Sequence, residues 1–155
     1  MKLKLSLILV ALTLCLTGIK AENPFAKLAK IKDVQCLQFD SIPDEGIKVK
    51  NINIGNNHEL IDTFDPKDIV ILITSKKKSI DKLFTKANKI CQKNGSDLLV
   101  NVNDGTDKVR IYIQYGETRS TIAFVVADDE DGVVLSANIK ADKEKLMNLL
   151  QSLNK

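Results

Sequence analysis

Aromatic residues and histidine are scarce in this chain. It has no tryptophan, and Phe, Trp and Tyr together make up only 5% of its 155 residues. Proteins that stack nucleic-acid bases rely on aromatic side chains, so such platforms are poorly supplied. His58 is the only histidine. Any catalytic relay through histidine would have to use this residue, and no nucleophile-elbow sequence accompanies it. We predict that His58 is a solvated loop residue rather than a metal ligand or catalyst.

The familiar chemistry-bearing motifs are missing as well. We find no glycine-rich phosphate loop, no dinucleotide-binding fingerprint and no CxxC pair. The acidic run 128–131 lacks the alternating ligands and terminal Glu of an EF-hand, so we interpret it as a turn between strands rather than a calcium loop. Lys76–Lys78 precedes a predicted helix, where cations are unfavourable, which leaves an anionic partner as an alternative to a solvated loop. We expect no catalytic residue, no metal and no cofactor.

The first 21 residues have the pattern of a cleavable signal peptide. Lys2 and Lys4 precede an apolar stretch from Leu5 to about Leu16, and Ala21 ends a segment suited to signal peptidase. The stretch is too short to cross a bilayer, which needs roughly 20 helical residues, although a retained anchor is the alternative. Cys15 follows Leu14 rather than a small residue, which disfavours a lipid anchor. We predict export to the periplasm or the cell surface, with residues 22–155 as one domain.

Removing this segment changes the charge balance. The whole chain has 23 Lys and Arg against 20 Asp and Glu, and residues 1–21 hold three of the lysines and no acid. The remaining 134 residues therefore carry 20 of each sign. Without a net positive field, little counterion release is available to drive phosphate binding. Nucleic acid is thus disfavoured as a partner, and no stable membrane span is expected after cleavage.

Cys36 and Cys91 are the two cysteines that remain. In an oxidising compartment an even pair suggests a disulfide. The alternative is that both are small buried hydrophobic residues. The sequence does not show whether the two side chains face each other.

The apolar pattern predicts an α+β fold. A short helix near residues 25–31 precedes a strand at 34–39, which is apolar on both faces and so suits the inside of a sheet. Residues 41–67 are the hardest segment to interpret, since a bulge or turn near Asn51 is needed to bring its apolar pairs to one face. A buried strand at 69–73 leads to a helix at 80–91, with Ser79 as its N-cap and Gly95 as its terminator.

The second half predicts a four-strand antiparallel meander. Its strands are residues 98–102, 109–115, 121–127 and 133–139, and the Asp104-Gly105 pair favours a tight hairpin. A closing helix follows Asp142, with Leu146, Leu149, Leu150 and Leu153 as its apolar stripe. We expect the two helices to pack on one face of the sheet. Arg110, Tyr112 and Gln114 would then point outward on the other face, as a binding surface.

With these elements in place, residues 83–150 resemble the exported Bacteroidota proteins grouped as domain-of-unknown-function family number 4252. The matching segments are Gly95–Val102, Val109–Ile113, Ile122–Val126 and Val133–Ile139, with the acidic turn and closing helix. The early helix and strand, Phe25 to Phe39, also look like the opening of that family, whereas region 41–67 departs from its pattern. The resemblance implies export, and an association with envelope-regulating sigma-factor systems, but it supplies no site residues.

These observations favour a non-catalytic envelope protein that binds another protein or a small ligand through a sheet face or an exposed edge. Two alternatives stay open. One is a hydrolase or other enzyme with a cryptic site, which would need buried polar groups with shifted pKa values in a pocket. The other is a structural subunit of a surface assembly.

Overall fold

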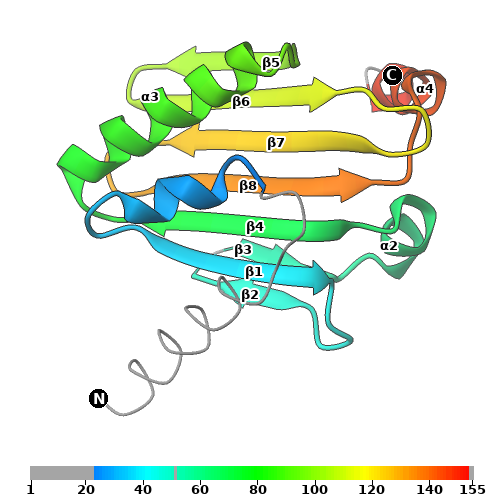
Figure 1. The fold of residues 1–155 in the computed structure, drawn as a ribbon, viewed down its shortest axis with the longest axis horizontal. Helices are drawn as coiled ribbons and strands as arrows, with labels where there is room; N and C mark the ends of the chain where they lie inside the picture. The colour runs from blue at the N-terminus through cyan, green and yellow to red at the C-terminus, as the bar shows by residue number, and fades with distance from the viewer. Residues whose placement is uncertain (1–22, 51, 154–155) are drawn as a thin grey trace.

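The computed structural model describes residues 23–50 and 52–153, and the predicted signal peptide lies outside them. Six strands form one antiparallel sheet in the order β1-β4-β8-β7-β6-β5 (Figure 1). Their bounds are β1 Gln35–Ser41, β4 Lys67–Thr74, β5 Asp97–Asp104, β6 Asp107–Gln114, β7 Ser120–Ala127 and β8 Gly132–Ile139. The α+β class and the C-terminal meander β5–β8 are confirmed.

Strand β4, next to the edge strand β1, is buried on both faces. Its run of Ile, Val and Leu from Ile69 to Ile73 alternates between two clusters of core residues. Val70 and Leu72 point towards one face, and Ile69, Ile71 and Ile73 point towards the other. Such a continuous β-branched run is typical of a strand covered on both sides.

Helix α3, Lys77–Lys93, covers one face of the sheet. Its apolar stripe, which includes Leu83, Ala87 and Cys91, packs on side chains of β4, β7 and β8. The helix begins three residues earlier than predicted, with Lys76 as the N-cap residue. Ser79 is not the cap. Its buried hydroxyl donates to the carbonyl of Lys32 instead, 2.8 Å away, and thereby ties the helix to the segment before β1.

The turns follow the predicted residue chemistry. Gly95 ends α3 with a φ of 70°, and the amide of Ser96 donates back to the carbonyl of Cys91. Gly105, with a φ of 60°, occupies the two-residue loop between β5 and β6. In the β7–β8 turn, the carboxylate of Asp128 accepts hydrogen bonds from the amides of Glu130 and Asp131, both at 2.7 Å. The acidic run therefore forms a turn, as predicted.

The first strand differs from expectation because β1 lies at the edge of the sheet. It is nevertheless covered on both faces, which explains its mixed pattern. Cys36 packs towards the cluster that contains α3 and the 3-10 helix η1, Ala26–Lys30. Leu37 and Phe39 pack towards the hairpin of β2, Ile47–Val49, and β3, Ile52–Ile54. A strand at the edge of a sheet can thus be apolar on both sides when other elements cover both of its faces.

The segment between β1 and β4 folds into this hairpin and a short helix. Ile47 pairs with Ile54, and Val49 pairs with Ile52, so the turn predicted near Asn51 brings all four apolar residues together. Asn51 itself lies outside the described residues. Helix α2, His58–Phe64, follows. The prediction that His58 is a loop residue is wrong in this respect, since His58 is the exposed first residue of α2.

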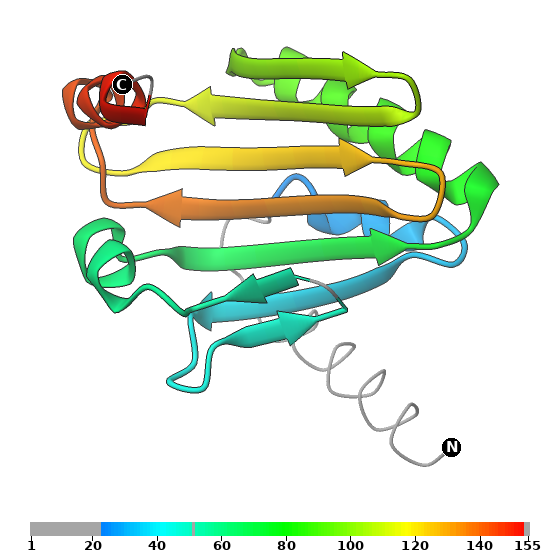
Figure 2. The same ribbon diagram turned by 180° about the vertical axis from the view of Figure 1, so that it is seen from behind.

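The closing helix α4, Lys143–Leu153, packs on the side opposite α3. Asp142 caps it by accepting from the amide of Lys145 at 2.9 Å, as predicted. Leu146 packs with Ile113 and Ile139, whose side chains point away from α3 by strand alternation. The expected placement of both helices on one face is therefore wrong, and Figure 2 shows α4 at one end of the second face. The side chains of Leu149, Leu150 and Leu153 lie outside the described part of the structure.

The buried Tyr112 gives a test of the packing under α3. Its hydroxyl donates to Oδ1 of Asn88 on α3 at 2.7 Å, and Tyr112 is only 3% exposed. Replacing Tyr112→Phe leaves the amide oxygen of Asn88 without this donor. We expect the free energy of unfolding in urea to fall by about 1–2 kcal/mol. Tyr115→Phe, directly after the end of β6, is the control and should change stability by less. An unchanged denaturation midpoint for Tyr112→Phe would contradict the contact.

Candidate functional site

The predicted binding residues Arg110, Tyr112 and Gln114 lie on the α3 side of the sheet, where Tyr112 is buried, Arg110 is partly exposed and Gln114 is exposed. Tyr112 is buried, so the prediction that it points outward is wrong. Arg110 stacks its guanidinium over the ring of Phe84 at 5.2 Å and donates to Asn101 at 3.3 Å. Gln114 donates to the carbonyl of Asn94 at 3.2 Å. The polar groups on this face are therefore used to attach α3 to the sheet.

Cys36 and Cys91 do not form the predicted disulfide. Both contribute to the core under α3, but no disulfide joins them. Cys91 is buried, and burial raises the pKa of its thiol to about 12. A thiol with such a pKa is not ionised near neutral pH and so is a poor nucleophile. The interpretation of Cys91 as a small buried hydrophobic residue fits the structure better.

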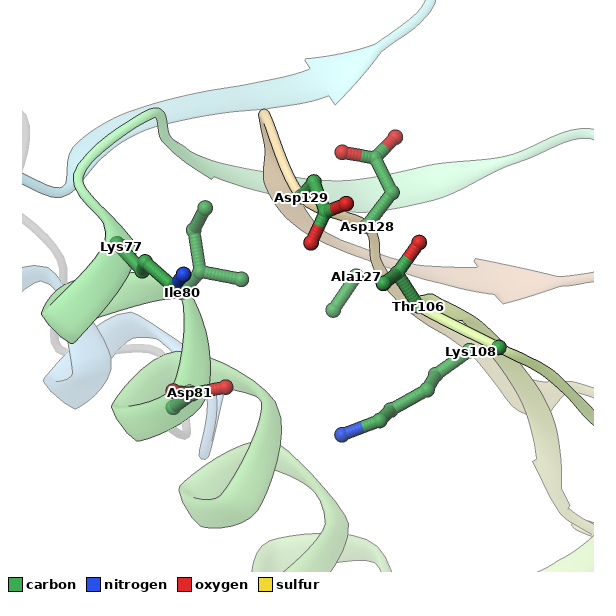
Figure 3. Close-up of a pocket in the computed structure, with 9 residues that line it drawn as sticks. Lys77, Ile80, Asp81, Thr106, Lys108, Ala127, Asp128 and Asp129 are labelled. Carbon is green, nitrogen blue, oxygen red and sulfur yellow. The ribbon is translucent and has the colours of Figure 1, made fainter.

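A cavity of about 190 Å³ lies between the start of α3 and the turns at the tips of the meander (Figure 3). Lys77 and Asp81 border it from α3, Lys108 from β6, and Asp128 and Asp129 from the β7–β8 turn. Both signs of charge line this shallow space. Among the described residues, no three His, Cys, Asp or Glu side chains are grouped closely enough to hold a metal ion. The cavity therefore offers neither a metal site nor an apolar pocket for a small molecule.

Lys50, Ser75 and Asp131 form a polar cluster beside the β2–β3 hairpin. The ammonium of Lys50 donates to the carboxylate of Asp131 at 2.6 Å and also to the hydroxyl of Ser75. The Ser75 hydroxyl donates to the same carboxylate oxygen at 2.6 Å. The hydrogen bonds from Lys50 and Ser75 lower the pKa of Asp131. This cluster connects the hairpin to the end of β4 and to the β7–β8 turn.

A serine beside a lysine resembles the nucleophile and base of some hydrolases, but the charges here favour a structural role. A lysine acts as a base only when it loses its proton, which requires desolvation or a cationic neighbour. Lys50 is 45% exposed and is paired with a carboxylate, which stabilises its charged form. The cluster thus holds the hairpin against the sheet.

A second ionic cluster holds the opposite end of the sheet together. The guanidinium of Arg119 donates to the carboxylate of Asp65 at 3.3 Å, to its carbonyl, and to the carbonyl of Asn138 at 3.2 Å. Lys67 pairs with the same carboxylate at 3.4 Å. Partial desolvation would raise the pKa of Asp65, but Arg119 and Lys67 outweigh it and lower that pKa. These contacts join α2, β4 and β8.

The face opposite α3 carries two rows of apolar side chains across four strands. We define the open face as these eight residues, which strand pairing places side by side. The first row is Val102, Val109, Val126 and Val133, and the second is Val100, Ile111, Phe124 and Leu135. Val102 is 45% exposed and the other seven are partly exposed. Figure 2 shows no described helix or strand in front of the middle of β5, β6 and β7.

Two covered regions border the open face. The β2–β3 hairpin packs over β1 and β4 and reaches Val133 and Leu135. At the other border, α4 packs over Ile113 and Ile139. Between them, the open face is a contiguous apolar surface of the kind that marks an interaction site on a soluble protein.

A row of four aspartates follows the first valine row at the tips of the meander. Asp104 pairs with Asp107 across the β5–β6 hairpin, one alternation beyond Val102 and Val109. Asp128 and Asp131 stand in the same positions relative to Val126 and Val133. The contact of Asp131 with Lys50 places its carboxylate on the hairpin side of the sheet. We call these four residues the aspartate row.

Residues 49–149 match the family described as a domain of unknown function, DUF4252. The chain belongs to this family. The match covers β3, both helices α2 and α3, and the whole meander, and so includes the open face and the aspartate row. No curated protein and no solved structure matches the chain. The DUF4252 match includes residues 49–67, so the expectation that region 41–67 departs from the family pattern is wrong for that part of it.

Our sequence analysis missed the open face of this DUF4252 protein. Alternation correctly places Val109, Ile111 and Ile113 on one side of β6. The prediction that both helices cover this side is what hid the open face. A sheet with apolar residues on both faces gives no sequence indication of which face a helix covers. The run of alternate aspartates in the two turns was interpreted only as turn chemistry.

No helix among the described residues is both long and apolar enough to cross a membrane.

The lowered pKa of Asp131 predicts how the hairpin contact depends on pH. An Asp with a folded-state pKa below its usual 3.8 stabilises the fold above that value, and the stabilisation is lost as the pH falls through the folded-state pKa. Asp131→Asn should therefore lower the free energy of unfolding near pH 7 by at most about 1 kcal/mol, because Lys50 is partly exposed to solvent. The difference from the unmodified protein should shrink towards zero at an acidic pH well below 3.8, where the carboxylate of Asp131 is protonated in the folded state as well.

Asp129→Asn, in the same turn, is the matched control for urea denaturation at both pH values. It should leave stability unchanged at each. An effect of Asp131→Asn that is the same at both pH values would show that the charge of Asp131 is not what holds the hairpin.

Proposed function

We propose that this DUF4252 protein is an exported, non-catalytic binding protein of the cell envelope, and that the open face is its binding surface. The single observation that carries the proposal is a set of eight contiguous apolar side chains, one exposed and seven partly exposed, on the face of the sheet that α3 does not cover. Leaving such a surface in water is unfavourable, so a protein that keeps one has a use for it.

The polar side chains favour binding over catalysis. Those considered for catalysis, the cluster at Lys50 and the cysteine Cys91, are used in an ion pair and in the core respectively. Each has a structural role that accounts for its position. The hydrolase alternative would have to rest on the mixed-charge cavity beside α3, whose charged side chains come from α3, β6 and the β7–β8 turn. A structural subunit of a surface assembly would use the same open face. The identity of the protein bound there would distinguish a binding protein from such a subunit.

Export is supported by the sequence of residues 1–21. We predict that the natural protein begins at Glu22, which N-terminal sequencing and intact-mass measurement of the protein purified from its host would show. Ala21→Arg should prevent cleavage and leave the longer chain in the membrane fraction, because signal peptidase requires a small residue there. Recovery of the unmodified protein with Met1 and the apolar stretch still attached would contradict cleavage.

Val102 and Leu98 provide a matched pair for testing the binding surface. Both lie on β5 with nearly equal exposure, 45% and 47%, but strand pairing puts Val102 on the open face and Leu98 on the α3 side. Val102→Gln should reduce recovery of the partner roughly fivefold, since about 1 kcal/mol of apolar contact is lost. Leu98→Gln should leave recovery unchanged. Quantitative mass spectrometry of proteins retained from envelope extracts measures both.

Both variants alter exposed positions, so thermal unfolding should stay close to that of the unmodified protein. Equal recovery of every bound protein with Val102→Gln and with the unmodified chain would remove the open face as the binding surface.

A further inference from the structure

The open face differs from the rest of the sheet in lacking a second layer. On the α3 side, helix and sheet form two complete layers. On the opposite side, the β2–β3 hairpin covers β1 and β4, and α4 covers one end. The uncovered part lies between these two elements (Figure 2). An element placed there would stand beside the hairpin and complete a three-layer arrangement, which is how sheets with two apolar faces are normally buried.

We propose that the open face binds one amphipathic α-helix of a partner protein, with Lys or Arg side chains at the end of that helix nearest the aspartate row. The inference rests on the proposed function and adds the kind of partner to it. The carrying observations are the two apolar rows, the elements that border them and the row of acidic side chains at one end.

The dimensions suit a single helix. Four strands spaced about 4.8 Å apart make each row roughly 14 Å long, and the two rows are about 7 Å apart along the strands. A helix with its side chains is about 10–12 Å wide. Layers that pack on a sheet lie about 10 Å from it, so a helix would fit as a layer beside the hairpin. The apolar area is on the order of 200 Å². A typical stable protein interface buries about 800 Å² on each partner, so the open face alone is too small for a second globular surface.

The border elements also disfavour a second copy of this chain. Because the hairpin stands out from the sheet on the same side, two copies placed face to face would bring their hairpins into contact before the apolar rows met, or would align aspartate row with aspartate row. A small apolar molecule fits poorly for a different reason. Small-ligand sites enclose most of the ligand in a concave pocket, whereas the rows lie on an extended sheet face.

Charge decides the orientation and composition of the helix. Asp104, Asp107 and Asp128 are exposed at one end of the apolar rows, and the partly exposed Asp131 beside them is already paired with Lys50. At the opposite border, α4 carries Lys143 and Lys145, whose ammonium groups lie over the rings of Tyr115 and Phe64. The two ends of the surface thus differ in charge sign. A helix whose basic side chains, and preferably whose positive N-terminal end, lie towards the aspartates matches the charge at both ends of the surface.

Photocrosslinking in the host cell tests the occupant directly. The full-length chain is expressed with p-benzoylphenylalanine in place of Val126, and the crosslinked peptide is sequenced by mass spectrometry. We expect a peptide from another protein whose apolar residues recur at helical spacing, with Lys or Arg at one end. The same photoreactive residue in place of Leu98, on the α3 side, is the control and should not capture that peptide.

The captured segment is then synthesised, and its affinity for the mature protein is measured by calorimetry and its helicity by circular dichroism. Asp104→Lys with Asp107→Lys should weaken binding roughly tenfold and reduce its dependence on salt. Asp40→Lys with Asp81→Lys changes the net charge equally at exposed positions on the α3 side, and should have little effect. Thermal unfolding of all variants checks that they fold.

The possible failures separate the two proposals. A captured segment without helical spacing, or one whose binding ignores the aspartate substitutions, overturns the helix and its charge but keeps the open face as a binding surface. Crosslinks to lipid, to a second copy or to residues 1–21 of the same chain also overturn the helix partner. Absence of any crosslink at Val126 overturns both the inference and the binding surface on which it rests.

Discussion

Burial of β4 on both faces is the constraint on which the other elements depend. Its five consecutive apolar residues must all leave water, and successive side chains of a strand point in opposite directions. One covering element is therefore never enough. Helix α3 covers Val70 and Leu72, and the β2–β3 hairpin covers Ile69, Ile71 and Ile73. The edge strand β1 is apolar on both sides because it lies in the same three-layer region of the molecule.

Only about half of the sheet is covered on both faces. The three layers extend over β1, β4 and part of β8, and the meander continues beyond them with α3 on one side alone. The strands β5, β6 and β7 nevertheless keep their apolar alternation facing away from α3. The open face is the consequence, because the chain provides apolar side chains for a layer that its described elements do not build there.

Polar side chains occupy different places on the two faces of the sheet. Under α3, polar side chains lie inside the contact, as in the hydrogen bond between Tyr112 and Asn88 and the stacking of Arg110 on Phe84. These groups make the position of the helix specific, since a shift would leave a buried polar atom without a partner. On the open face the polar groups lie at the ends and the centre is apolar. A surface with this distribution is suited to a partner that brings its own apolar stripe.

Much of the local structure follows from the sequence alone. The meander, its tight turns, the apolar stripe and the Gly95 terminus of α3 and the cap at Asp142 depend on alternation, helical spacing and turn residues, all of which act between neighbours in the chain. The family could also be recognised from these segments. What the sequence could not decide is which face of the sheet each covering element chooses, because apolar residues occupy both sides of the strands.

The face that α3 covers determines which residues of the sheet are available for binding. Arg110, Tyr112 and Gln114 were expected in solvent because polar side chains usually are, yet α3 carries Asn88, Phe84 and Asn94 at the places where they can be satisfied. The valines opposite them were expected in the core, yet Val102 is exposed and the others are partly exposed. Strand alternation determined which residues share a face, whereas only the tertiary structure decided which face meets water, since that depends on contacts between segments far apart in the chain.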